Sequence, residues 1–165
     1  MKALAFTATP VWADSKISIK QYDDGSVYKG TFKDGIRHGL ATYVTANGFT
    51  YTGQWIDGGI GGQGIAKYPN GSLYEGQFLD GKPHGQGSIT FADGGSYLGN
   101  WLNGEIFGKG TAKYANGSIY IGNFNKAKHH GLGTLTTLAG FIYRGKWLNG
   151  QQIGSATVIY ADGSK

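Results

Sequence analysis

The sequence contains no cysteine, three prolines and one methionine in 165 residues. The absence of cysteine excludes disulfide bridges, thiolate metal sites and a cysteine nucleophile. No apolar run approaches the ~20 residues that a membrane-spanning helix requires. Long helices are disfavoured, because each of the 31 glycines would cost about 1 kcal/mol relative to alanine inside a helix. The net charge of +5 permits an acidic partner but does not identify one.

Aromatic residues are plentiful, with 11 Tyr, 8 Phe and 4 Trp, and most of them recur with a fixed period. A tyrosine stands every 23 residues, followed two residues later by glycine and four residues later by Phe or Trp. Residues 28–165 hold six such periods without an insertion or deletion, and such a repeat indicates an array rather than a single compact domain. The aromatic positions of this pattern are Tyr28, Phe32, Tyr51, Trp55, Tyr74, Phe78, Tyr97, Trp101, Tyr120, Phe124, Tyr143 and Trp147.

The Phe and Trp positions alternate strictly, so the larger unit spans 46 residues. We interpret the segments 33–38, 79–84 and 125–130, which follow the Phe positions, as basic loops. The corresponding loops after Trp contain no histidine and carry apolar residues such as Ile106 and Phe107 instead. The loops after Phe form a candidate basic stripe that comprises Lys33, Arg37, His38, Lys82, His84, Lys126, Lys128, His129 and His130.

Each repeat contains two stretches that alternate with period two, which is typical of half-buried strands. The turns between them read Ala-Asn-Gly, Pro-Asn-Gly or Ala-Asp-Gly at 46–48, 69–71, 92–94 and 115–117. Pro69 fixes φ near −65°, so a type I′ turn, which needs positive φ, is excluded there. A type I turn followed by a glycine bulge fits. This turn pairs Ala66 with Tyr74 and Gly64 with Gly76, which places the apolar positions on one face and mostly Thr, Gln, Lys and Ser on the other.

The whole pattern resembles the membrane occupation and recognition nexus (MORN) repeat: Tyr-x-Gly-x-Phe/Trp, a mid-loop Gly, Gly-x-Gly and Asn-Gly in phase over residues 28–165, with half a repeat at 14–27. The resemblance implies an all-β, elongated, single-layer antiparallel meander of six β-hairpins. It also implies a non-catalytic role in binding proteins, in self-association or at membranes. Departures from the pattern are local: Ala41, Ala156, Ala127, Thr45 and Thr137.

Residues 1–13 resemble the end of a bacterial secretory signal, with Val11 and Ala13 at the small-residue positions before a cleavage site. This interpretation predicts a periplasmic or secreted protein. The alternative is an N-terminal strand that caps the sheet, and the protein would then be cytoplasmic or peripheral to a membrane.

Motifs that suggest chemistry are better explained by the repeat. The Gly-x-Gly-x-x-Gly match at 59–64 has no helix after it, which a dinucleotide fingerprint requires. In a meander, His38, His84 and His130 are ~20 Å apart, too far to share a zinc ion. We therefore expect no metal, no cofactor and no enzymatic activity.

The aromatic row is the best candidate for a binding surface, because a single-layer sheet cannot bury both faces and some of these rings are then expected to stay accessible. The alternative is that the row is the core, with rings stacked on cross-strand glycines and on one another. Our first hypothesis is a scaffold for a protein partner or a homo-oligomer. The second is a peripheral module in which the basic loops bind anionic phospholipid headgroups, and the third is a glycan-binding aromatic surface. Nucleic acid is not expected, because acidic residues interrupt the basic ones.

Overall fold

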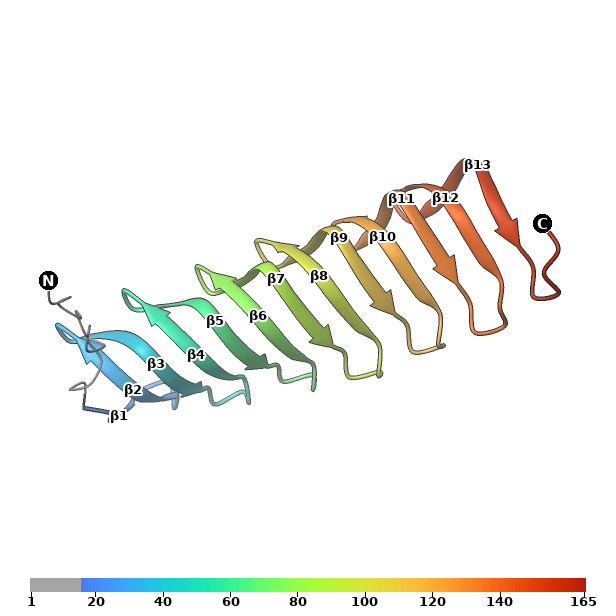
Figure 1. The fold of residues 1–165 in the computed structure, drawn as a ribbon. Coiled ribbons are helices and arrows are strands. Elements are labelled where there is room, and N and C mark those ends of the chain that lie inside the picture. The colour runs from blue at the N-terminus through green and yellow to red at the C-terminus, as the bar shows by residue number, and fades with distance from the viewer. Residues whose placement is uncertain (1–15) are drawn as a thin grey trace, which may run out of the picture.

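The computed structural model describes residues 16–165, so the segment 1–13 lies outside the described residues. These form one antiparallel sheet of thirteen strands in chain order, with the first and last strands at opposite ends (Figure 1). The prediction of an all-β, single-layer meander is therefore confirmed. Among the described residues, no helix is long and apolar enough to cross a membrane. The strands are β1 (Ser18–Gln21), β2 (Val27–Lys33), β3 (Ile36–Val44), β4 (Thr50–Ile56), β5 (Gly59–Lys67), β6 (Leu73–Leu79), β7 (Lys82–Thr90), β8 (Ser96–Leu102), β9 (Glu105–Lys113), β10 (Ile119–Asn125), β11 (Lys128–Thr136), β12 (Ile142–Leu148) and β13 (Gln151–Ile159).

The Asn-Gly hairpins have the predicted geometry. The amide of Gly71 donates to the carbonyl of Tyr68, and the amide of Tyr68 donates to the carbonyl of Ser72, both at 2.9 Å. Gly71 has a φ of 89°, as the bulge position of a three-residue hairpin requires. The pairs Ala66–Tyr74 and Gly64–Gly76 are also found, so the predicted register is confirmed.

The segments that we interpreted as basic loops are hairpins with two-residue turns. Asp80 and Gly81 both have positive φ, 49° and 75°, which defines a type I′ turn. Strand β6 runs up to this turn and β7 leaves it at once. The loop assignment of 33–38, 79–84 and 125–130 was therefore wrong, because strand residues flank a tight turn in each segment.

Each longer strand carries a bulge at the first glycine of the Gly-x-Gly pattern. In β5, Gly62 has a φ of 72°, and the register towards β4 shifts at this point. The side chain of Gln54 compensates, because its Oε1 accepts a hydrogen bond from the amide of Gln63 at 2.7 Å. Gln77 accepts from Gln86 in the same way at 2.8 Å. Side-chain amides thus replace ladder hydrogen bonds at the bulges, as buried or half-buried backbone groups require.

Candidate functional site: the two faces of the sheet

The tyrosine row forms the core of the sheet. Tyr51 and Tyr74 are fully buried although the sheet has only one layer. Their rings lie over glycines of the following strand: a Cβ at Gly64 would stand 2.6 Å from Cζ of Tyr51, and one at Gly87 would stand 2.5 Å from Cζ of Tyr74. Glycine gives the tyrosine ring room at these positions, whereas Ala41 occupies the equivalent position beside Tyr28, which is also fully buried, so the glycine ladder favours the burial of the tyrosines without being its sole cause.

Phe and Trp rings close the core between repeats. The ring of Tyr74 meets Phe78 of its own repeat at a centroid distance of 5.0 Å and Trp101 of the next repeat at 5.1 Å, both edge to face. This arrangement is favoured by the aromatic quadrupole. Of the twelve predicted site residues, Phe32 is partly exposed and the others are buried. The expectation that some rings of this row stay accessible holds only for Phe32, because the other rings bury one another.

The tyrosine hydroxyls are satisfied within their own repeats. Tyr74 donates to the carbonyl of Gln77 at 2.9 Å, and Tyr28 donates to that of Thr31 at the same distance. Burial raises the pKa of the most enclosed tyrosines to about 12, and these are Tyr51, Tyr74, Tyr97 and Tyr120. They are consequently neutral at physiological pH and act as packing groups rather than as proton donors to a substrate.

One further position per repeat covers the core, namely the residue that pairs with the Phe or Trp across the tight hairpin turn. Its residue type varies along the array. Arg37 holds its guanidinium 4.3 Å from the ring centroid of Trp55, a cation–π contact. Four repeats later, at the equivalent position, His129 stacks on Tyr120 at 3.6 Å, and its Nε2 is 2.6 Å from the hydroxyl of Tyr114. Burial lowers the pKa of His129, so this imidazole is neutral at physiological pH.

The structure does not bring the candidate basic stripe together. Arg37 and His129 pair with Phe32 and Phe124 and lie on the aromatic face, whereas the neighbouring His38 and His130 lie on the opposite face because side chains alternate. His38 reaches Asp57 of the next turn, with Nδ1 4.0 Å from Oδ1. No group of three His, Asp or Glu side chains within residues 16–165 is arranged to hold a metal ion.

Sequence reasoning missed a second aromatic row on the aromatic face. Three of its members are Tyr68, Phe91 and Tyr114, which stand directly before the three-residue turns of successive hairpins. We call these three residues the aromatic ledge. Phe91 is 37% exposed and Tyr114 is 38% exposed, and Tyr68 is partly buried against Phe49, with 5.7 Å between their centroids. Their spacing of 23 residues was the signal that could have revealed them.

The opposite face is more apolar than predicted. Between its Thr, Gln, Lys and Ser side chains it exposes many aliphatic residues, because the strands alternate and their second face has no covering layer. The most exposed members that the strands carry are Ile19, Leu40, Ile56, Leu98, Ile121 and Leu132.

Solved structures of low sequence identity share this fold. The TCP domain of Drosophila melanogaster SAS-4 (dCPAP), solved in complex with a proline-rich motif of Ana2 (dSTIL), has a TM-score of 0.56 and 13% identity, with 99% of this chain and 95% of that chain covered. The TCP10 domain of Danio rerio CPAP, solved with a STIL peptide, has a TM-score of 0.52 and 14% identity, with 89% and 65% covered. A CPAP G-box domain has a TM-score of 0.56 and 12% identity, with 90% and 78% covered.

A search of curated proteins gave no significant match. The family comparison is specific, however, because the model described as "MORN repeat" matches residues 28–50, 51–73, 74–96, 97–119, 120–137 and 143–165. The repeat boundaries fall at the tyrosines that begin each period, and together the matches span most of the chain. The chain belongs to the MORN repeat family.

Proposed function

We propose that the protein is a non-catalytic interaction scaffold that binds an extended, proline-rich segment of a protein partner along its aromatic face. The observation that carries this proposal is the aromatic ledge, which leaves aromatic rings accessible beside a rigid, fully packed core. Rigid rings offer a large contact area at a low cost in conformational entropy. The buried row from Tyr28 to Trp147 then supports the ledge rather than contacting the partner over its whole length.

The spacing of the ledge suits a polyproline II helix. Each repeat adds two strands, so equivalent rings advance by ~10 Å. A polyproline II helix rises ~3.1 Å per residue with three residues per turn, which gives ~9 Å per turn. One turn of such a segment therefore spans one repeat, and a proline can meet each ring in succession.

The structural neighbours support a peptide partner by their fold. Two of them were solved with a bound peptide, and in one of these the peptide is a proline-rich motif. At 13% and 14% identity the likeness concerns the fold alone, so the proposal rests on the ledge. The phospholipid and glycan alternatives stay predictions.

Fluorescence anisotropy with a labelled peptide that contains two Pro-x-x-Pro motifs tests the proposal, with a Gly-for-Pro peptide as the control ligand. Phe91→Ser and Tyr68→Ser should each weaken binding by about tenfold, which corresponds to ~1.4 kcal/mol, with the urea midpoint little changed for the exposed Phe91. Phe107→Ser is the matched control, because Phe107 is 43% exposed on the opposite face.

Two further results bear on the aromatic face. The double variant Tyr97→Ala, Trp101→Ala removes buried rings and should lower stability by several kcal/mol, at ~3–5 for one buried aromatic, so its loss of binding would follow from unfolding. If Phe107→Ser weakens binding while Phe91→Ser and Tyr68→Ser do not, the aromatic face is not the site. Equal binding of the Gly-for-Pro peptide would refute the polyproline geometry.

A further inference from the structure

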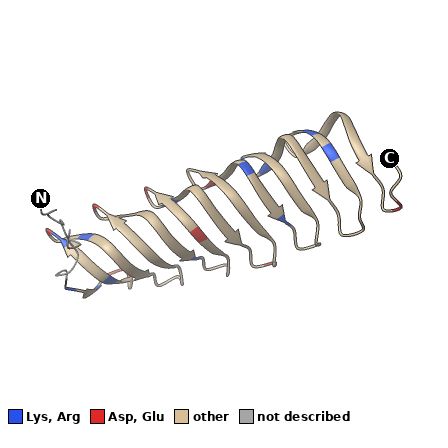
Figure 2. Ribbon diagram, in the orientation of Figure 1, with Lys and Arg blue, Asp and Glu red and all other residues tan. Residues whose placement is uncertain are grey.

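Charge is distributed unequally along the sheet. Between Glu105 and Asp162 the chain has no acidic residue, whereas eight acidic residues lie among residues 16–105. In Figure 2 the sheet beyond the first residue of β9 carries blue segments and no red ones until the C-terminal end. The cations of this region are Lys109, Lys113, Lys126, Lys128, Arg144 and Lys146.

Most of these cations lie on the opposite face. Arg144 and Lys146 alternate with Tyr143 and Trp147, whose rings are buried in the core. Lys109 and Lys113 alternate in the same way with residues of the aromatic face in β9, since Ala112 pairs with Tyr120. The C-terminal part of the opposite face is therefore cationic, with the exposed aliphatic side chains of Ile121 and Leu132 set among the charges.

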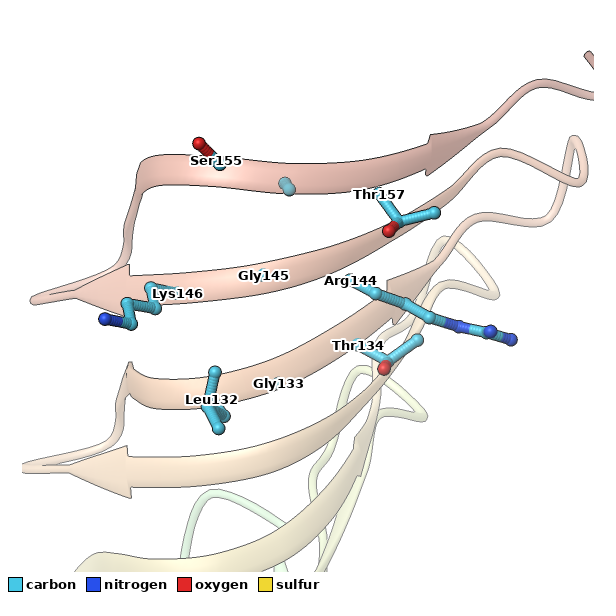
Figure 3. A pocket seen from close by; sticks show the side chains of 9 residues that line it. Leu132, Gly133, Thr134, Arg144, Gly145, Lys146, Ser155 and Thr157 are labelled. Atoms are coloured by element: carbon cyan, nitrogen blue, oxygen red, sulfur yellow. The ribbon is translucent and has the colours of Figure 1, made fainter. Parts of the chain in front are cut away.

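An open pocket of about 670 Å³ lies at the C-terminal end of this region, on β11, β12 and β13. Its floor is the backbone of Gly133, Gly145 and Ala156, because a side chain at Gly133 or Gly145 would point to the aromatic face. Figure 3 shows Arg144 at one end of the pocket and Lys146 at the other. The remaining lining side chains are Leu132, Thr134, Ser155 and Thr157.

The two cations of the pocket have no acidic partner. The one ion pair within residues 16–165 joins His38 to Asp57, and no carboxylate lines the pocket. The hydroxyls of Thr134, Ser155 and Thr157 add neutral donors beside the two charges. This combination of cationic and hydroxyl donors is complementary to carboxylates.

We propose that this pocket and the cationic face around it bind an acidic polypeptide segment with carboxylates at alternate positions. Arg144 and Lys146 are two residues apart on one strand, so their Cα atoms stand ~6.6–6.8 Å apart. An extended segment repeats its side chains on one face with the same spacing. Glu residues at positions i and i+2 can therefore meet both cations, while apolar residues of the segment contact Leu132 and Ile121.

A protein segment suits this surface better than a membrane does. Arg144 and Lys146 flank an open depression whose floor is backbone (Figure 3), which leaves room for an extended chain between them, and a twisted sheet does not present its cations in one plane. The proposal concerns the opposite face and is independent of the aromatic ledge, so the two can be tested and can fail separately.

The experiment uses fluorescence anisotropy with a labelled peptide in which Glu alternates with Val and Thr, and a matched peptide with Gln for Glu. Arg144→Gln and Lys146→Gln should each weaken binding up to about fivefold, the upper range for one exposed ion pair. Binding should also weaken with added salt. Both residues are exposed, so the urea midpoints of these variants should match that of the unchanged protein.

Lys29→Gln is the matched control, because Lys29 occupies the repeat position of Arg144 five repeats earlier, in β2. It should leave binding unchanged, and so should Phe91→Ser on the aromatic face. Equal binding of the Gln peptide, or an equal loss with Lys29→Gln, would overturn the proposal. A third result would also overturn the proposal. If the acidic peptide does not bind, and the protein co-sediments with vesicles of phosphatidylserine and phosphatidylcholine in a manner that depends on Arg144 and Lys146, the surface is a membrane contact.

Discussion

Replacing Gly87 by alanine tests directly whether close ring-to-glycine packing holds the sheet together. A Cβ at this position would lie 2.5 Å from Cζ and 2.7 Å from Cε2 of Tyr74. The ring of Tyr74 has no free space to move into, because Phe78 and Trp101 contact it at centroid distances of 5.0 and 5.1 Å. Tyr74 must therefore shift within a packed core, which costs about 1–3 kcal/mol.

The substitution should also disturb a hydrogen bond. The indole Nε1 of Trp101 donates to the carbonyl of Gly87 at 3.1 Å. The chain already holds alanine at the equivalent position of an earlier repeat, Ala41, and there the corresponding indole Nε1 of Trp55 is buried without a hydrogen-bond partner. An unsatisfied buried donor costs about 1–3 kcal/mol, so Gly87→Ala should lose about 2–6 kcal/mol in total.

Urea unfolding measures this loss. With a slope of ~2 kcal/mol/M, the midpoint should fall by roughly 1–3 M. Gly59→Ala is the control: a Cβ there would come no nearer than 3.7 Å to the Ile56 carbonyl oxygen, so stability should stay within ~0.5 kcal/mol. The reverse change, Ala41→Gly, should stabilise by giving Trp55 an acceptor. If Gly87→Ala is no more costly than Gly59→Ala, the tyrosines do not need the glycine ladder and its proposed contribution to their burial is wrong.

Three further outcomes are expected. Burial raises the pKa of four tyrosines from 10.0 to about 12, so as the pH rises the unfolded state loses their protons before the folded state does. Urea midpoints should therefore fall between pH 10 and 12. Unchanged midpoints, with phenolate absorbance appearing near pH 10, would contradict the burial of these tyrosines. His129 has a pKa lowered from 6.5, so the unfolded state binds the proton more readily and stability should fall as the pH drops below about 6.5; His129→Gln should flatten this slope and His84→Gln should not. Equimolar zinc should leave the midpoint unchanged, and a zinc-dependent increase that is lost on mutation would contradict the prediction that no metal binds His38, His84, His129 or His130.

The strand pairing could be predicted from the sequence because two local signals agree. The 23-residue period shows which residues are equivalent, and Pro69 excludes one of two hairpin geometries, which sets the register. The second hairpin was missed although Asp80-Gly81 and Asn103-Gly104 are typical of type I′ turns. The bulge at the glycine a few residues after each of these turns interrupts the alternation, so the strand there was mistaken for a loop.

The candidate site was less predictable, because it depends on which face each residue occupies. With 33–38 interpreted as a loop, Arg37 and His38 could not be assigned to opposite faces. The packing of rings on the paired glycines could be anticipated from the register, but how completely the tyrosines are buried could not, because it also depends on Phe and Trp rings of the same and the next repeat. The pocket between Arg144 and Lys146 likewise arises from the juxtaposition of β11, β12 and β13.

The alternation of Phe and Trp sets the unit in which this array can grow or shrink. Every interior tyrosine from Tyr51 to Tyr120 packs against one ring of its own repeat and one of the next, and these are always one Phe and one Trp. Excising residues 51–96 would join Thr50 to Tyr97 in phase and leave every tyrosine beside the junction with one small and one large neighbour. Excising only 51–73 would bring two Phe-type repeats together and leave a void where an indole belongs. Length variation in such arrays should therefore proceed by pairs of repeats, because the pair is the smallest insertion or deletion that keeps the core filled.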